Sequence, residues 1–220
     1  MKAFLLAAGK GERLKPLTNE VPKPLIKVRG KPLIQWHVER LKSSGINEIV
    51  INLFYLGHMI EEFLGDGSKF GLNIKYSKEE KLLGTGGGII KALSLLGEQP
   101  FLLLSSDVWT VLPFQDLSLP SWASAHMILV KPDNNLGDLN LDNGLVNNLN
   151  QGIRYSYSGI SIVRPEIFVK QENHNSDLWR AFLSPQVDRG LVTGEVINKT
   201  IFNVNSLKDI QKIDAMMLEE

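Results

Sequence analysis

Two short segments near the start of the chain combine a flexible backbone with positive charge. Residues 7–13 read AAGKGER directly after an apolar run, and Lys23 stands between two prolines. Glycine and alanine let a backbone approach a ligand closely and expose its N–H groups, which attract anions. Proline on both sides restricts the backbone around Lys23 and so partly presets its position. We predict that Gly9 and Gly11 shape an anion-binding loop and that Arg13 and Lys23 supply its positive charge.

This loop differs from two well-known phosphate-binding loops. A dinucleotide-binding fingerprint needs a third glycine where Arg13 stands, and a P-loop needs Gly-Lys-Ser/Thr after the turn. The glycines alone are a weak signal, because they could simply turn the chain and leave the lysines in solvent. Their combination with the cations favours a phosphate site of another class.

A carboxylate follows a strongly apolar strand in the middle of the sequence. Asp107 comes after the apolar run 101–104 and two serines. Open α/β sheets bind ligands beyond the carboxyl ends of their strands, which favours a ligand role for Asp107 over that of a turn or cap residue. Trp109 is a candidate wall for a sugar pocket, but a tryptophan beside a buried strand is at least as often packed in the core.

The elements that must hold these residues change in type along the chain. In the first half, apolar runs predict strands at 1–7, 48–53, 72–76 and 101–104, and amphipathic stretches predict helices at 32–44 and 57–64. A Gly-rich turn at 84–88 is predicted to open a third helix that runs to about residue 96. This alternation predicts an α/β fold with a Rossmann-like, mainly parallel sheet flanked by helices. In the second half, turn residues separate predicted strands at 125–130, 137–141, 145–149 and 155–163, which indicates hairpins and an antiparallel β extension, before a closing helix at 207–218.

Composition limits the organisation and the partners. The 220 residues suit one domain spanning 1–220, and Lys plus Arg equal Asp plus Glu at 24 each. Net charge therefore supplies no general attraction for nucleic acid or membrane, and the anion site must be built locally. Cysteine is absent, which excludes disulfides and thiolate metal sites. Without an apolar run of about 20 residues or a signal-peptide pattern, we expect a cytoplasmic protein, whose oligomeric state the sequence does not indicate.

Several motifs together resemble the sugar-1-phosphate nucleotidyltransferases. They are LAAGKGERLKPLT at 6–18, PKPL at 22–25, GTGGG at 84–88, DVWT at 107–110, NLGD at 135–138 and SGI at 158–160. The resemblance covers nearly the whole chain and, within the family, is closest to the N-acetylmuramate 1-phosphate uridylyltransferases of bacterial cell-wall recycling. It implies a glycosyltransferase-A-like nucleotidyltransferase fold. It also implies that a nucleoside triphosphate, with UTP favoured, is joined to a sugar 1-phosphate with release of pyrophosphate.

The resemblance also implies roles for individual residues. Arg13 and Lys23 would contact the triphosphate, and Asp107 would bind Mg²⁺; these three form the catalytic set. Such a reaction brings two anions together, so the protein must align them and neutralise their charge. The implied nucleotide-binding residues are Leu6, Ala7, Ala8, Gly9, Gly11, Arg13, Lys23, Asn52, Thr85 and Gly86. The candidate sugar-binding residues are Trp109, Asp138 and Gly159.

One position departs from the family pattern. Near the C-terminus the family carries a second metal-binding aspartate, and Asn203 stands there in the stretch 201–207, IFNVNSL. An amide oxygen can coordinate a metal but brings no negative charge. Two hypotheses follow: an active enzyme, in which a guanylyl- or thymidylyltransferase is the close alternative to a uridylyltransferase, or a nucleotide-binding homologue with little turnover. The presence of Arg13, Lys23 and Asp107 together favours the enzyme.

Overall fold

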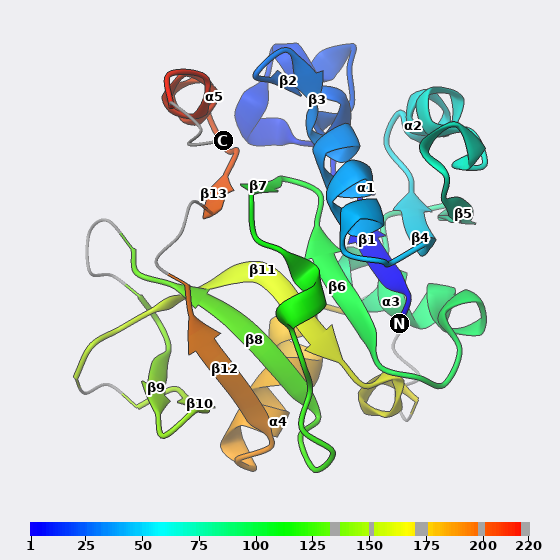
Figure 1. The fold of residues 1–220 in the computed structure, drawn as a ribbon. Coiled ribbons are helices and arrows are strands. Elements are labelled where there is room, and N and C mark those ends of the chain that lie inside the picture. The colour runs from blue at the N-terminus through cyan, green and yellow to red at the C-terminus, as the bar shows by residue number, and fades with distance from the viewer. Residues whose placement is uncertain (133–136, 150–151, 170–175, 198–200, 217–220) are drawn as a thin grey trace.

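The computed structural model describes residues 1–132, 137–149, 152–169, 176–197 and 201–216. Within these residues, a nine-stranded mixed sheet has the order β5-β4-β1-β6-β11-β8-β12-β10-β9 (Figure 1). Its first four members are parallel to one another, as predicted: β1 (Ala3–Leu6), β4 (Glu48–Leu53), β5 (Asn73–Lys78) and β6 (Phe101–Ser105). The connecting helices are α1 (Leu33–Ser43), α2 (Gly57–Leu64) and α3 (Gly84–Leu96).

Helices cover both faces of the parallel strands. Successive side chains of β1 point to opposite faces, so Ala3 and Leu5 join the core cluster that contains α1 and α2, whereas Phe4 joins the cluster that contains α3. The same alternation holds in β6, where Leu102 and Leu103 face opposite ways. Burial on both faces explains why these strands appear in the sequence as continuous apolar runs.

The second half extends the sheet in a different order from the predicted hairpins. Strand β11 (Ser156–Val163) is antiparallel to both β6 and β8 (Ala125–Val130). Among the strands predicted in this half, and within the described residues, consecutive ones pair only at β9 (Asn140–Asp142) and β10 (Leu145–Asn147), which an Asn-Gly turn with two positive φ angles connects. Strand β8 instead pairs in parallel with β12 (Val192–Val196), which the sequence analysis did not predict.

The segment before β12 was also missed. A π-helical turn at Trp179–Leu183 continues into α4 (Ser184–Asp188). A proline in the first turn of α4 and Gly194 in the middle of β12 obscure both patterns. Gly194 has a packing reason, since a Cβ there would lie 2.7 Å from Cγ2 of Val146 on β10.

A third core cluster joins the two ends of the chain above the carboxyl ends of the parallel strands. It lies around β7 (Val108–Thr110), which pairs antiparallel with β13 (Ile201–Asn203), and around α5 (Leu207–Asp214). The short ribbon of β2 (Lys27–Val28) and β3 (Lys31–Pro32) lies at the same end of the molecule (Figure 1). The buried members of the third core cluster are Leu14, Ile26, Val28, Leu33, Trp109, Val204 and Ile213. The predicted closing helix reached residue 218, whereas α5 ends at Asp214 and residues 217–220 lie outside the described part.

In the described part of the chain, none of the helices has the length and apolar character needed to cross a bilayer.

Candidate active site

A cavity of about 500 Å³ opens at the carboxyl ends of β1, β4 and β6. The loop after β1, the end of β4, the start of α3 and the end of β6 each contribute to its wall. The lining residues are Leu6, Ala7, Ala8, Gly9, Gly11, Glu12, Arg13, Lys23, Pro24, Asn52, Leu82, Gly84, Thr85, Ser105, Ser106 and Asp107. The cavity therefore brings together the glycine loop, its cations and the carboxylate of Asp107.

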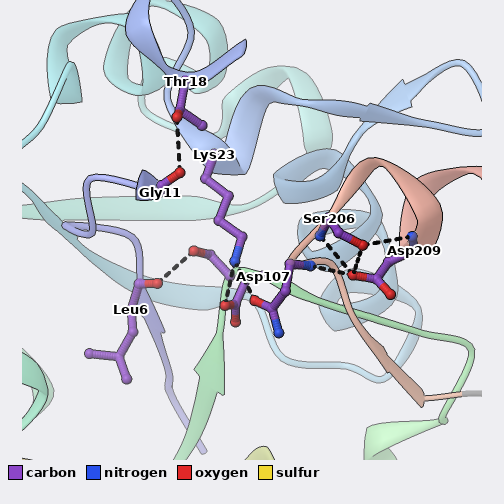
Figure 2. Close-up of polar contacts among 9 residues, drawn as sticks. Leu6, Gly11, Thr18, Lys23, Asp107, Ser206 and Asp209 are labelled. Atoms are coloured by element: carbon purple, nitrogen blue, oxygen red, sulfur yellow. Dashed lines mark hydrogen bonds and ion pairs between the residues drawn. The ribbon is translucent and has the colours of Figure 1, made fainter. Parts of the chain in front are cut away.

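The two glycines of the loop differ in their surroundings. Gly11 has φ +64°, and a Cβ there would lie 2.8 Å from Cγ2 of Thr18 and 3.1 Å from Cβ of Lys23. The hydroxyl of Thr18 donates to the Gly11 carbonyl at 2.9 Å, which holds the loop closed on itself (Figure 2). A Cβ at Gly9, by contrast, meets no atom of the described residues within 4 Å. Gly11 thus shapes the loop, and Gly9 leaves open space in the cavity.

Lys23 connects segments that are distant in the sequence. Its ammonium donates to Oδ2 of Asp107 at 2.7 Å and to Oδ1 of Asn205 at 3.0 Å (Figure 2). The side chains of Lys23 and Asp107 are 11% and 29% exposed, so this charge-assisted bond is shielded in part from water. Arg13 is exposed on the turn Glu12–Leu14 and lines the same cavity.

Asn52 and Glu79 form a buried polar relay behind the cavity. The backbone N–H of Ala7 donates to Oδ1 of Asn52 at 2.7 Å, and Nδ2 of Asn52 donates to Oε1 of Glu79 at 2.7 Å. The other oxygen of Glu79 accepts from the N–H of Leu83 at 3.0 Å. The amide of Asn52 is therefore bonded to protein through both of its polar atoms. The sequence analysis missed Glu79, because the predicted strand ended at residue 76, whereas β5 continues to Lys78 and places Glu79 at the carboxyl edge of the sheet.

Ser106 and His37 support the loop that carries Asp107. The Ser106 hydroxyl donates to the Leu6 carbonyl at 2.6 Å, which ties the end of β6 to the end of β1. His37, on α1, is buried beneath this loop. Burial lowers the pKa of His37 from 6.5 to about 4, and a hydrogen bond with the Ser106 backbone and the charge of Asp107 oppose this shift only in part. His37 is consequently neutral at pH 7.

Two residues that were predicted to contact the ligands, Trp109 and Gly86, do not line the cavity. Trp109 is fully buried and packs edge-on against Trp36, with ring centroids 5.9 Å apart. This burial contradicts the prediction that Trp109 walls a sugar pocket. Gly86 does not line the cavity either, because it is buried in α3, where a Cβ would lie 2.4 Å from the ring of Phe182. Close helix packing, rather than ligand approach, accounts for this glycine.

Three further predicted residues lie outside the cavity wall. Asp138 is exposed, and its N–H donates to the Tyr155 carbonyl at 3.1 Å. Gly159 has φ +87° at a bulge of β11 and packs against Ser105, which does line the cavity. Asn203 is exposed on β13, where it pairs with Val108. The sugar-binding roles of Asp138 and Gly159 stay predictions.

Comparison with protein families identifies the class of protein to which this cavity belongs. The model of the family "Nucleotidyl transferase" matches residues 2–130, which include the glycine loop, Lys23, Asn52 and Asp107. The chain belongs to the nucleotidyl transferase family. This nucleotidyl transferase is 51% identical over 178 residues to an N-acetylmuramate α-1-phosphate uridylyltransferase of Neisseria meningitidis serogroup B, covering 76% of the chain and 77% of that relative.

Other relatives match about half of the chain or share its fold. A mannose-1-phosphate guanyltransferase of Gibberella zeae is 41% identical over 120 residues, which span 53% of this chain and 33% of that relative. The structure of HddC from Yersinia pseudotuberculosis, complexed with GMP-PN, superposes with a TM-score of 0.80 at 23% identity over 97% of both chains. The UDP-glucose pyrophosphorylase of Acinetobacter baumannii gives a TM-score of 0.76 at 18% identity, over 97% of this chain and 91% of that one.

The fold and the class of enzyme follow from these comparisons. The architecture is the glycosyltransferase-A-like nucleotidyltransferase fold, as predicted. The nucleotidyl transferase is a sugar-1-phosphate nucleotidyltransferase, whose family substrates are nucleoside triphosphates and sugar 1-phosphates.

Proposed function

We propose that this nucleotidyl transferase joins UTP to N-acetylmuramate 1-phosphate with release of pyrophosphate. The observation that carries the reaction is the convergence of Arg13, Lys23 and Asp107 on the cavity that the glycine loop lines. The choice of base and sugar is supported by the relative from Neisseria meningitidis, which matches over most of both chains.

The chain's own groups suit a displacement at phosphorus. A phosphate oxygen of the sugar 1-phosphate attacks the α-phosphorus, the bond to the β-phosphate oxygen breaks, and pyrophosphate leaves with that electron pair. Arg13 and Lys23 neutralise the negative charge that gathers on the transferring and leaving oxygens. The amide N–H groups of the glycine loop hold the triphosphate in line with its attacker, and no covalent nucleophile is needed.

The donor set at Asp107 fits a hard divalent cation. Mg²⁺ is held in proteins by one or two carboxylates, with the rest of its shell taken from phosphates and water. Asp107 offers such a carboxylate, and the ammonium of Lys23 already balances its charge there. In the described residues, no cluster of three or more His, Cys, Asp or Glu is arranged for a metal, which agrees with a site that the substrate phosphates complete. When bound, Mg²⁺ would neutralise phosphate oxygens.

The binding-only hypothesis loses its main support. It rested on Asn203 as a lost metal-binding carboxylate, but Asn203 is exposed on β13, and the side chain from this segment that contacts Lys23, the partner of Asp107, is that of Asn205. The Lys23–Asp107 pair therefore has a protein oxygen from this segment without Asn203. This position favours turnover over binding alone.

The test is pyrophosphate release from purified protein with Mg²⁺, for each nucleoside triphosphate paired with a panel of sugar 1-phosphates. We expect UTP with N-acetylmuramate 1-phosphate to give the highest kcat/KM. GTP or dTTP with another hexose 1-phosphate as the best pair would overturn the substrate assignment. Triphosphate binding by calorimetry without release from any pair would instead restore the binding-only hypothesis. Asp107→Asn serves as the inactive control for contaminating enzymes.

A further inference from the structure

The oxygen that shares the Lys23 ammonium with Asp107 comes from Asn205, two residues beyond the expected position. Oδ1 of Asn205 lies 3.0 Å from Nζ of Lys23, which lies 2.7 Å from Oδ2 of Asp107. Two oxygens from distant segments thus share one positive charge. Strand β13 ends at Asn203, and the N–H of Val204 donates to the Asp107 carbonyl at 2.8 Å, so the chain is fastened to Asp107 immediately before Asn205.

Asp209 holds the backbone that presents Asn205. Its Oδ2 accepts from the N–H of Asn205 at 2.9 Å, from the N–H of Ser206 at 2.7 Å and from the Ser206 hydroxyl at 2.9 Å. The Ser206 hydroxyl in turn accepts from the N–H of Asp209 at 3.3 Å, which completes a capping box at the start of α5 (Figure 2). One carboxylate therefore does two things: it caps α5, and it fixes the residue before the cap.

We propose that Asn205, not Asn203, supplies the second protein oxygen for the divalent cation at Asp107, and that Asp209 is the positioning residue that aims it. The inference rests on the proposed function, because the cation serves the triphosphate. A carboxylate and an amide oxygen are both hard ligands of the kind that Mg²⁺ and Mn²⁺ accept. The two protein ligands then bring one negative charge, which the Lys23 ammonium balances, so most of the cation's affinity comes from the nucleotide phosphates.

Calorimetry with non-cleavable nucleotides tests the site without turnover. The probes are the α,β-methylene analogues of UTP and GTP, each titrated with Mn²⁺ and again with EDTA. The ratio of the two dissociation constants measures how far the metal tightens nucleotide binding. Because either base reports this ratio, a wrong assignment of base or sugar leaves the test intact, and pyrophosphate assays decide that question separately.

Two matched pairs separate the alternatives. We expect Asn205→Ala to reduce the ratio about tenfold, the factor that 1.4 kcal/mol represents, and Asn203→Ala to leave it within about twofold. Asn205→Asp, which adds a charge, is expected to increase the ratio. If Asn203→Ala lowered the ratio of dissociation constants and Asn205→Ala left it unchanged, the assignment would be overturned.

The second pair distinguishes positioning from helix capping. Ser206→Ala removes the hydroxyl of the cap but leaves the bond between the Asn205 N–H and Asp209. Asp209→Ala instead removes the carboxylate that accepts from the Asn205 N–H and from Ser206. Both variants lower the melting temperature, but only Asp209→Ala is expected to lower the metal ratio. An equal drop of the ratio in the two variants, or no drop in either, would show that Asp209 only caps α5.

Discussion

At the scale of single residues, Glu79 connects two segments of the cavity wall through neutral donors. It accepts from the side chain of Asn52 and from the N–H of Leu83, and Asn52 in turn accepts from Ala7. We expect Glu79→Ala to raise the KM for the nucleoside triphosphate about tenfold with a smaller effect on kcat. The reason is that two buried donors lose their acceptor, at a cost of about 1–3 kcal/mol each. Initial rates measure this, with exposed Glu80→Ala as control; equal KM values in the two variants would contradict the relay.

His37 gives the stability of the protein a pH dependence of known sign. Its pKa is lowered from 6.5 to about 4 by burial, so between these values the unfolded chain binds a proton that the folded chain does not. Stability is therefore lost as the pH falls. From pH 7 to pH 5 we expect His37 to account for roughly 2 kcal/mol of the loss. Urea unfolding at both pH values measures it, and His37→Leu should show a change that is smaller by this amount; parallel changes would exclude His37 as the cause.

The residues of the N-terminal loop could be predicted because their role is local. The turn at the glycines and the restricted backbone around a lysine between prolines depend only on neighbouring residues, not on the rest of the fold. Gly9, Arg13 and Lys23 therefore line the cavity as the motif indicates. Asn205 could not be found in this way, because only the folded chain brings it beside Lys23. The capping-box pattern formed by Ser206 and Asp209 was the available local signal.

At the scale of elements, the glycine in the loop after β1 leaves room for a ligand, whereas the glycine in the first turn of α3 allows close packing inside the protein. A Cβ at Gly9 would enter the open cavity, whereas a Cβ at Gly86 would collide with the ring of Phe182. We expect Gly86→Ala to destabilise the protein by about 1–3 kcal/mol through overpacking, and Gly9→Ala to leave stability almost unchanged while weakening triphosphate binding. Denaturant unfolding and calorimetry on both variants measure the two effects, and a stability loss confined to Gly9→Ala would contradict this description.

Elements with one clear periodicity were predicted well, and those with mixed signals were not. The predicted bounds of α2, β4 and β8 agree with the structure, since each has an uninterrupted pattern between turn residues. Helix α3 ends where predicted but begins at Gly84, inside the segment predicted as a glycine-rich turn. Strand β12 carries a glycine in its centre, and its partners β8 and β10 come from other parts of the chain. Pairing between distant segments leaves little trace in local sequence, so the order of strands in the second half was beyond prediction.

At the scale of the whole molecule, the sheet runs through both halves of the chain without interruption. Strand β6 pairs with β1 on one side and with β11 on the other, so the parallel and antiparallel parts share one layer. We propose that residues 1–220 unfold as one domain and expect coincident transitions by far-ultraviolet dichroism and tryptophan fluorescence. Two separated transitions would instead show that the chain unfolds as two domains.

Ligand binding should shift that single transition. With UTP and Mg²⁺ at about one hundred times the dissociation constant, we expect a stabilisation of about 2.7 kcal/mol, because only the folded chain has the cavity. Arg13→Ala should lose most of this shift at the same ligand concentration, since one cation of the triphosphate site is missing. Differential scanning calorimetry measures both. An unchanged shift in Arg13→Ala would exclude this residue from the triphosphate site.

The insertion of β12 between β8 and β10 also sets the order of events during synthesis. Residues 125–147 leave the ribosome well before Val192–Val196, yet β12 pairs along its whole length with Ala125–Leu129 of β8, and β10 pairs with the sheet through β12. Until the late strand arrives, the nascent chain carries an unpaired strand edge that invites association with other chains. Folding of the second half must therefore wait until Val192–Val196 has been synthesised, and a ribosome that stalls before that point holds an aggregation-prone intermediate.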